Sequence, residues 1–274
     1  MTGSFAPDCR VIEVDDPRLA AFFDAGQPDI GTVWELCMFF EFDREETVRC
    51  IADWIGPPQG VRVLDCACGS GFPALGLAAL GYDVTCTDGS RLMLGHFARN
   101  ARLDGLDLTG LRVPWHELPG RFGGRFDVVL NRGGGNYRYA GVWDRGGLAD
   151  RTAMAEAIEQ WVACLRPGGR LYVDIPPDPG ADSVSDSTTQ HPTLLLGGHV
   201  VDLVERITVE PPTGIRTWHT WLTVDGGTHE FERRAFHIVA DELVGILTAC
   251  GLEDVHVVDV PGEFYDVFCG RKPR

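Results

Sequence analysis

The sequence has no long apolar run, and its first residues lack the features of a secretory leader. No stretch approaches the roughly 18 consecutive apolar residues that a membrane span requires. A signal peptide has an apolar core behind a basic start, and residues 1–16 lack this pattern. We therefore expect a cytoplasmic protein that makes no membrane contact.

Basic residues are scarce, and the nine cysteines form no metal or disulfide pattern. The 274 residues include 24 Lys and Arg against 40 Asp and Glu, so the formal net charge is −16. This balance argues against a nucleic-acid partner, because neutralising phosphates supplies much of that affinity. Cys66 and Cys68 are the only close cysteine pair, without a nearby histidine, so we expect no metal and a reducing compartment. A small-molecule partner suits the composition, and a homo-oligomer stays open.

From about residue 60 onward, strand-like runs alternate with helical patterns, which indicates an α/β fold with a mainly parallel sheet. The predicted strands of this part are 61–65, 82–87, 111–113, 126–131 and 170–175. Helices are predicted at 72–80, at 91–102 and along the apolar face from Met154 to Leu165. The polar, proline-rich residues 176–199 predict a long loop. The later part of the chain predicts antiparallel strands at 201–209, 215–224 and 229–236, a helix near Leu243, and a closing hairpin of 255–260 and 264–269.

A glycine-containing turn follows the first of these strands. Gly69 and Gly71 permit a tight turn and a close approach to a ligand, where a Cβ would collide. Asp88 ends the next strand, where nucleotide-binding α/β folds place an acid on ribose hydroxyls. The same glycines would also fit a dinucleotide fingerprint. Asp65 favours another ligand, because a carboxylate at the strand end suits an ammonium better than a pyrophosphate.

Val63–Gly71 together with Asp88 resembles the first two motifs of class I S-adenosylmethionine-dependent methyltransferases. From about residue 30 the chain is similar to the glycine N-methyltransferase group and related small-molecule enzymes. The resemblance implies S-adenosylmethionine as cofactor and a Rossmann-like sheet with helices on both faces. It also implies one domain over 1–274, whose parts are a cover region with a cover helix (1–58), a cofactor-binding core (59–175), a loop and antiparallel lid inserted after the fifth strand (176–238), and a C-terminal helix and hairpin (239–274).

The resemblance also assigns cofactor contacts along the N-terminal half. These are Trp34, Arg44, Asp65, Ala67, Gly69, Gly71, Asp88, Gly89, Trp115, Asn131 and Arg132. Arg44 matches the arginine that holds the methionine carboxylate in that group, and Trp115 matches a tryptophan near the adenine. The segment after the fifth strand departs from the pattern, because it reads Asp174-Ile-Pro-Pro where the glycine enzymes carry a carboxylate-binding arginine. We therefore do not carry glycine over as the substrate.

Substrate-binding candidates follow the fourth predicted strand, lie near the end of the fifth, or lie on a predicted strand of the lid. They are Asn136, Tyr137, Tyr139, Asp174 and Trp218, while Tyr137 and His219 are the candidates for a catalytic group that stays unknown. Because the sulfonium activates the methyl group, an amine acceptor needs no strong enzyme base. The sequence contains no His/Asp pair that would indicate such a base. The sequence favours N-methylation of an amine, such as an amino acid derivative, an amino sugar or a natural-product intermediate. O- or C-methylation is the alternative, ahead of a nucleotide-dependent oxidoreductase or a non-catalytic binding protein.

Overall fold

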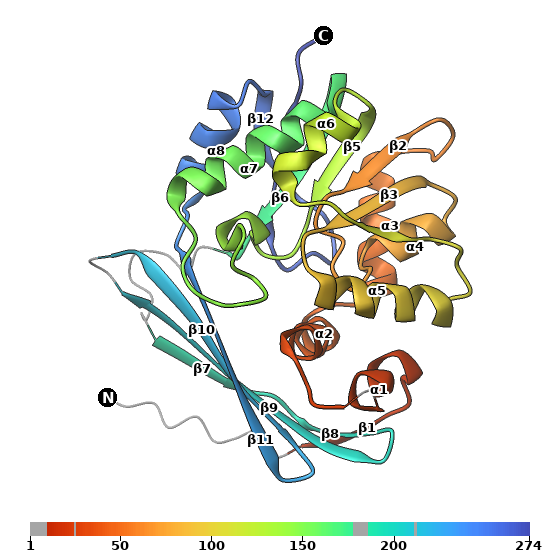
Figure 1. The fold of residues 1–274 in the computed structure, drawn as a ribbon, viewed down its shortest axis with the longest axis vertical. Coiled ribbons are helices and arrows are strands. Elements are labelled where there is room, and N and C mark those ends of the chain that lie inside the picture. Colours follow the sequence, from red (N-terminus) through yellow and green to blue (C-terminus); the bar gives the residue numbers. More distant parts are fainter. Residues whose placement is uncertain (1–9, 25, 178–185, 211–212) are drawn as a thin grey trace.

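The computed structural model describes residues 10–24, 26–177, 186–210 and 213–274, which form two β-sheets with helices around them (Figure 1). The larger sheet has the strand order β12-β13-β6-β5-β2-β3-β4. Its strands are β2 (Arg62–Asp65), β3 (Asp83–Asp88), β4 (Gly110–Arg112), β5 (Phe126–Asn131), β6 (Leu165–Ile175), β12 (Glu253–Val258) and β13 (Asp266–Arg271). Neighbours from β6 to β4 are parallel, whereas β13 is antiparallel to β6. This is the Rossmann-like arrangement that was predicted.

Helices cover both faces of the larger sheet, which explains why the middle of the central strands β2 and β5 is apolar on both faces (Figure 1). One face carries α3 (Arg44–Ile55), α4 (Ala74–Ala79) and α5 (Arg91–Leu103), and the other carries α6 (Leu118–Phe122), α7 (Arg151–Cys164) and α8 (Ala240–Ala249). Val63 and Leu64 on β2 are fully buried, one against each helical layer. None of the helices in the described ranges combines the length and apolar content that a membrane crossing needs.

The smaller sheet lies apart from the larger one and includes strands of the segment that was predicted as a lid (Figure 1). Its order is β1-β8-β9-β10-β11, with β7 also paired to β9. Its strands are β1 (Val11–Val14), β7 (Asp186–Gln190), β8 (Thr193–Leu196), β9 (His199–Glu210), β10 (Ile215–Val224) and β11 (Gly227–Phe236). The prediction of one loop over 176–199 is therefore wrong for β7 and β8, while residues 178–185 lie outside the described residues. The strand β1, which pairs in parallel with β8, was not predicted.

Two N-terminal helices lie between the sheets, α1 (Pro17–Asp24) and α2 (Ile30–Glu41) (Figure 1). Asp29 begins α2 with a capping box, in which its carboxylate accepts from the Thr32 amide and the Thr32 hydroxyl accepts from the Asp29 amide. Val33 and Leu36 are fully buried in an apolar cluster shared with the smaller sheet. The burial of this face fixes α2 over the carboxyl ends of the central strands.

Candidate active site

A cavity of about 380 Å³ opens at the carboxyl ends of β2 and β3, where open α/β sheets bind ligands. Its walls include seven of the predicted cofactor contacts, namely Trp34, Ala67, Gly69, Asp88, Gly89, Trp115 and Arg132. The other four lie outside it, namely Arg44, Asp65, Gly71 and Asn131. Gly71 shapes the loop instead: its φ is +117°, and a Cβ there would lie 2.4 Å from Cδ1 of Leu75.

Asp88 joins the two loops that border this cavity. Its carboxylate accepts hydrogen bonds from the Gly69 amide at 2.9 Å and from the Ser90 amide at 2.8 Å. Burial raises the pKa of Asp88 to about 6, although these amide bonds act in the opposite direction. The side chain lines the cavity, so its carboxylate is available to hydroxyl groups of a ligand.

Asp65 and Asn131 lie at the ends of neighbouring strands and carry unsatisfied acceptors. Asp65 Oδ1 accepts from the Ala67 amide at 3.2 Å, but Asp65 Oδ2 and Asn131 Oδ1 have no hydrogen-bond partner among the described residues. Burial raises the pKa of Asp65 to about 7. Buried acceptors of this kind normally have donors, so the strand ends fit a cofactor that carries an ammonium group. S-adenosylmethionine has such a group in its methionine part.

Two tryptophans form apolar walls of the cavity. Trp115 donates from Nε1 to the Cys66 carbonyl at 2.6 Å and packs edge-on against Trp161. Trp34, on α2, packs edge-on against both Trp143 and Trp218. An aromatic wall next to the Asp88 carboxylate fits an adenosine, because the rings bind the base while the acid binds the ribose.

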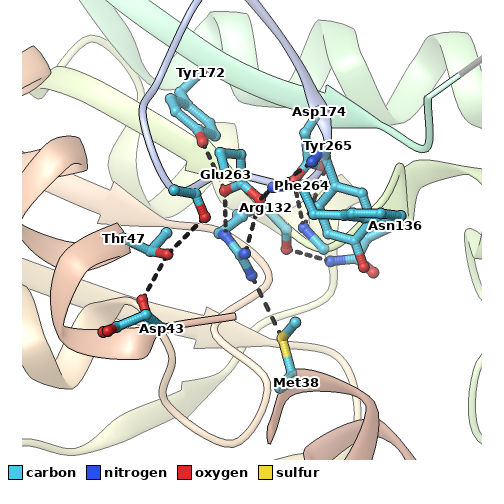
Figure 2. Close-up of polar contacts among 12 residues, drawn as sticks. Met38, Asp43, Thr47, Arg132, Asn136, Tyr172, Asp174, Glu263, Phe264 and Tyr265 are labelled. Atoms are coloured by element: carbon cyan, nitrogen blue, oxygen red, sulfur yellow. Dashed lines mark hydrogen bonds and ion pairs between the residues drawn. The ribbon is translucent and has the colours of Figure 1, made fainter. Parts of the chain in front are cut away.

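Two predicted arginine contacts have protein partners. Arg44 pairs with Glu35 at 2.7 Å, and the same glutamate accepts from the Ser70 hydroxyl, so Arg44 supports the glycine loop from behind. The Arg132 guanidinium forms a two-pronged pair with Glu263, at 2.7 and 2.9 Å (Figure 2). It lies 4.3 Å from the Phe42 ring centre. The guanidinium of Arg132 is thus neutralised by the segment that precedes β13.

A second cavity of about 200 Å³ adjoins the first, with Trp34, Tyr139 and Trp143 lining both. It lies between α2, the glycine run that follows β5, and the smaller sheet. Of the predicted substrate contacts, Tyr139 and Trp218 line this second cavity, whereas Asn136 lines the first and donates to the Arg132 carbonyl at 2.6 Å (Figure 2).

Three predicted site residues are placed elsewhere. Asp174 is fully buried and accepts from the Gly133 and Gly135 amides, so it shapes the glycine run instead of facing substrate. Tyr137 is fully buried against Trp161, which removes it as a catalytic candidate. His219 is removed as well, because it stacks on Trp221, pairs with Glu230 and lines neither cavity.

The second cavity also contains polar residues that were not predicted, among them Glu41, His191, Glu205 and Arg216. Glu205 Oε1 lies 2.5 Å from His191 Nε2, and Glu205 Oε2 accepts a hydrogen bond from Trp218 Nε1 at 2.6 Å. Arg216 could have been found from strand alternation, since it lies two residues before Trp218 on β10. His191 carried no signal, because its segment reads as a loop.

Residues 63–169 match the family model described as a methyltransferase domain. Over 113 residues the chain is 33% identical to a glycine/sarcosine N-methyltransferase of Halorhodospira halochloris, covering 41% of this chain and 39% of the relative. Over 211 residues it is 26% identical to a ubiquinone biosynthesis O-methyltransferase of Rhizobium leguminosarum bv. trifolii, covering 77% and 65%. The alignments thus span less than two thirds of these relatives.

Among solved structures, the chain is similar to the sugar N-methyltransferase KedS8 from Streptoalloteichus, with a TM-score of 0.62 and 20% identity over 84% of this chain and 87% of that one. At this identity the similarity shows the fold. The domain match over residues 63–169, the relatives and the fold together support a class I S-adenosylmethionine-dependent methyltransferase.

Proposed function

We propose that this chain transfers a methyl group from S-adenosylmethionine to an amine nitrogen of a small molecule. The observation that carries the proposal is the Glu41 carboxylate in the wall of the second cavity, next to the space assigned to the cofactor. Glu41 makes no hydrogen bond to another described residue. Although the Glu41 residue is exposed to solvent, partial burial of its carboxylate and the neighbouring Glu205 raise the pKa of Glu41 to about 7, so an incoming ammonium finds a carboxylate without a protein partner.

The cofactor, when bound, supplies an activated methyl group, so the protein has to orient the acceptor and exclude water. Trp34, Tyr139 and Trp143 separate the two cavities and provide aromatic faces, which attract cationic groups by about 0.5–2 kcal/mol. The names of two relatives agree with nitrogen as the acceptor atom, since one acts on glycine or sarcosine and one on a sugar. The cavity volumes support a small molecule, and not a macromolecule, as the partner.

O-methylation is the second candidate, and one observation favours it. The pair of His191 and Glu205 lines the same cavity, and an imidazole held by a carboxylate is a suitable base for a hydroxyl group. The ubiquinone biosynthesis O-methyltransferase relative points the same way.

Matched amine and hydroxyl acceptors distinguish the two candidates. We expect S-adenosylhomocysteine release with benzylamine and with amino sugars, little release with benzyl alcohol and the parent sugars, and a mass increase located on nitrogen. Glu41→Gln should raise the KM for the amines roughly tenfold, since a charge-assisted hydrogen bond is lost. His191→Gln is the matched variant for the alternative. Turnover of the hydroxyl series alone, abolished by His191→Gln, would replace the amine proposal with O-methylation.

A further inference from the structure

Arg216 points from the smaller sheet into the second cavity. It lies on β10 in register with Val209 of β9 and Ala235 of β11. Side chains two residues apart share a face of a strand, and on this face Trp218 and Leu222 are 8% and 0% exposed. Arg216 therefore belongs to the inner face of the sheet, and it lines the cavity at the end of this row.

The guanidinium of Arg216 has no hydrogen bond or ion pair with any described residue. Two neighbouring arginines are satisfied, because Arg132 pairs with Glu263 and Arg138 donates to the carbonyls of Gly134 and Gly135. Burial lowers the pKa of Arg216, and the neighbouring Glu205 acts in the opposite direction without forming an ion pair with it. A guanidinium has five donors, so this one is available to a ligand.

The remaining charges of the cavity define which ligand would complement it. Both carboxylate oxygens of Glu205 already have partners, one in His191 and one in Trp218, and Glu205 forms no ion pair with Arg216. One free guanidinium, on β10, and one free carboxylate, that of Glu41 on α2, are left. The other walls include six aromatic residues, namely Trp34, Tyr139, Trp143, Trp218, Phe264 and Tyr265. The complement is a molecule with one anionic group, one amine and an apolar body.

We propose that Arg216 is the specificity-determining residue of the second cavity and binds a carboxylate of the acceptor, so that the acceptor is an aminocarboxylate with an apolar, ring-sized body. A single guanidinium beside two glutamates suits a carboxylate better than a phosphate dianion. Only the amine of this acceptor rests on the proposed function, whereas its carboxylate is inferred from Arg216. It also changes the expectation from the sequence, because the carboxylate clamp that is missing after the fifth strand is supplied by the lid instead.

Binding tests this assignment without turnover. Benzoate, benzamide and phenyl phosphate would be titrated into the complex with S-adenosylhomocysteine, by calorimetry. We expect benzoate to bind in preference to the other two, and Arg216→Met to weaken it roughly ten- to a hundredfold, as for the loss of charge-assisted hydrogen bonds. Arg216→Lys should keep part of the affinity. Arg206→Met is the matched control, because Arg206 lies on the exposed face of the same sheet and pairs with Asp186.

The affinity for S-adenosylhomocysteine and the melting temperature should not fall in Arg216→Met, since its guanidinium has no partner to lose. Equal binding of benzoate and benzamide, an unchanged benzoate affinity in Arg216→Met, or tighter binding of phenyl phosphate would each overturn the carboxylate assignment. Turnover separates this result from the proposed function. If benzylamine and 4-(aminomethyl)benzoate are methylated with the same kcat/KM, the amine proposal stands and the role of Arg216 fails. If benzoate binding depends on Arg216 but neither amine is methylated, the carboxylate site stands and the amine proposal fails for these acceptors.

Discussion

Three buried carboxyl groups surround the loops of the first cavity, and they differ in what they are bonded to. Burial raises the pKa values of Asp65 and Asp174 to about 7 and that of Asp88 to about 6. Asp88 accepts from backbone amides of two loops, and Asp174 accepts from two amides of the glycine run that follows β5. Asp65 keeps one oxygen without a partner among the described residues. The fold without a ligand therefore carries an unfavourable charge at Asp65, and an ammonium would relieve it.

Asp65→Asn tests this cost through the pH dependence of stability. The pKa of Asp65 is about 7 in the fold and about 4 in the unfolded chain, so the folded protein binds the extra proton between these values. The stability of the wild type must then fall, relative to Asp65→Asn, as the pH rises from about 4 to about 7, by roughly 2–4 kcal/mol. Thermal melts of both proteins at several pH values measure the difference.

The same substitution at Asp107, an exposed residue before β4, is the matched control. Asp65→Asn should also weaken S-adenosylhomocysteine binding roughly tenfold or more, because the ammonium loses its anionic partner. A stability difference that does not change with pH would contradict the cost assigned to Asp65.

At the scale of elements, α2 is the helix on which both cavities depend. It supplies Trp34 to both cavities and Glu41 to the second, and it lies between the two sheets (Figure 1). Its orientation is set by the buried Val33 and Leu36 and by the capping box at Asp29. Loosening the first turn of α2 should therefore lower the affinity for ligands of both cavities.

Removal of the cap by Asp29→Ala should cost about 0.5–2 kcal/mol of the free energy of unfolding. We expect faster hydrogen exchange at the amides of α2, together with weaker binding of S-adenosylhomocysteine. Asp43→Ala is the matched control, since Asp43 caps the next helix, α3, through the Glu46 amide. If both variants change exchange and binding equally, the special position of α2 is not supported.

The sequence predicts those elements whose signal is local. β2, β3 and β5 are apolar runs next to turn residues, and Gly69 and Asp88 belong to a motif with fixed spacing, so both the sheet and part of the cofactor space follow from the sequence. β7 could not be predicted, because Asp186–Gln190 is polar and exposed and becomes a strand only through its pairing with β9. Arg216 was missed for a related reason. Alternation with Trp218 gives the face of β10 on which Arg216 lies, but the cavity that it lines depends on how this face packs against α2, which no local pattern specifies.

At the scale of the whole molecule, the ligand space lies where the two sheets face α2, so a bound cofactor contacts segments that are distant in sequence. Trp34, Asp88, Trp115 and Arg132 line one cavity although they come from separate elements. Such a ligand binds only the folded chain and therefore stabilises the fold as a whole.

S-adenosylhomocysteine at about a hundred times its dissociation constant should raise the melting temperature by roughly 5–10 °C. NAD should produce no shift, because Asp65 would oppose a pyrophosphate at the strand end. Differential scanning fluorimetry with both ligands is sufficient, and Asp88→Ala should reduce the shift. Stabilisation by NAD without a response to S-adenosylhomocysteine would overturn the cofactor assignment.

Three aromatic residues, Trp34, Tyr139 and Trp143, line both cavities. The partition can therefore be altered by a single substitution that leaves the backbone of both sheets in place. A smaller residue at Trp34 would join the two spaces, and the joined volume would admit sulfonium donors that carry an alkyl group longer than methyl. The same feature that separates donor from acceptor thus makes this chain a candidate scaffold for engineered alkylation.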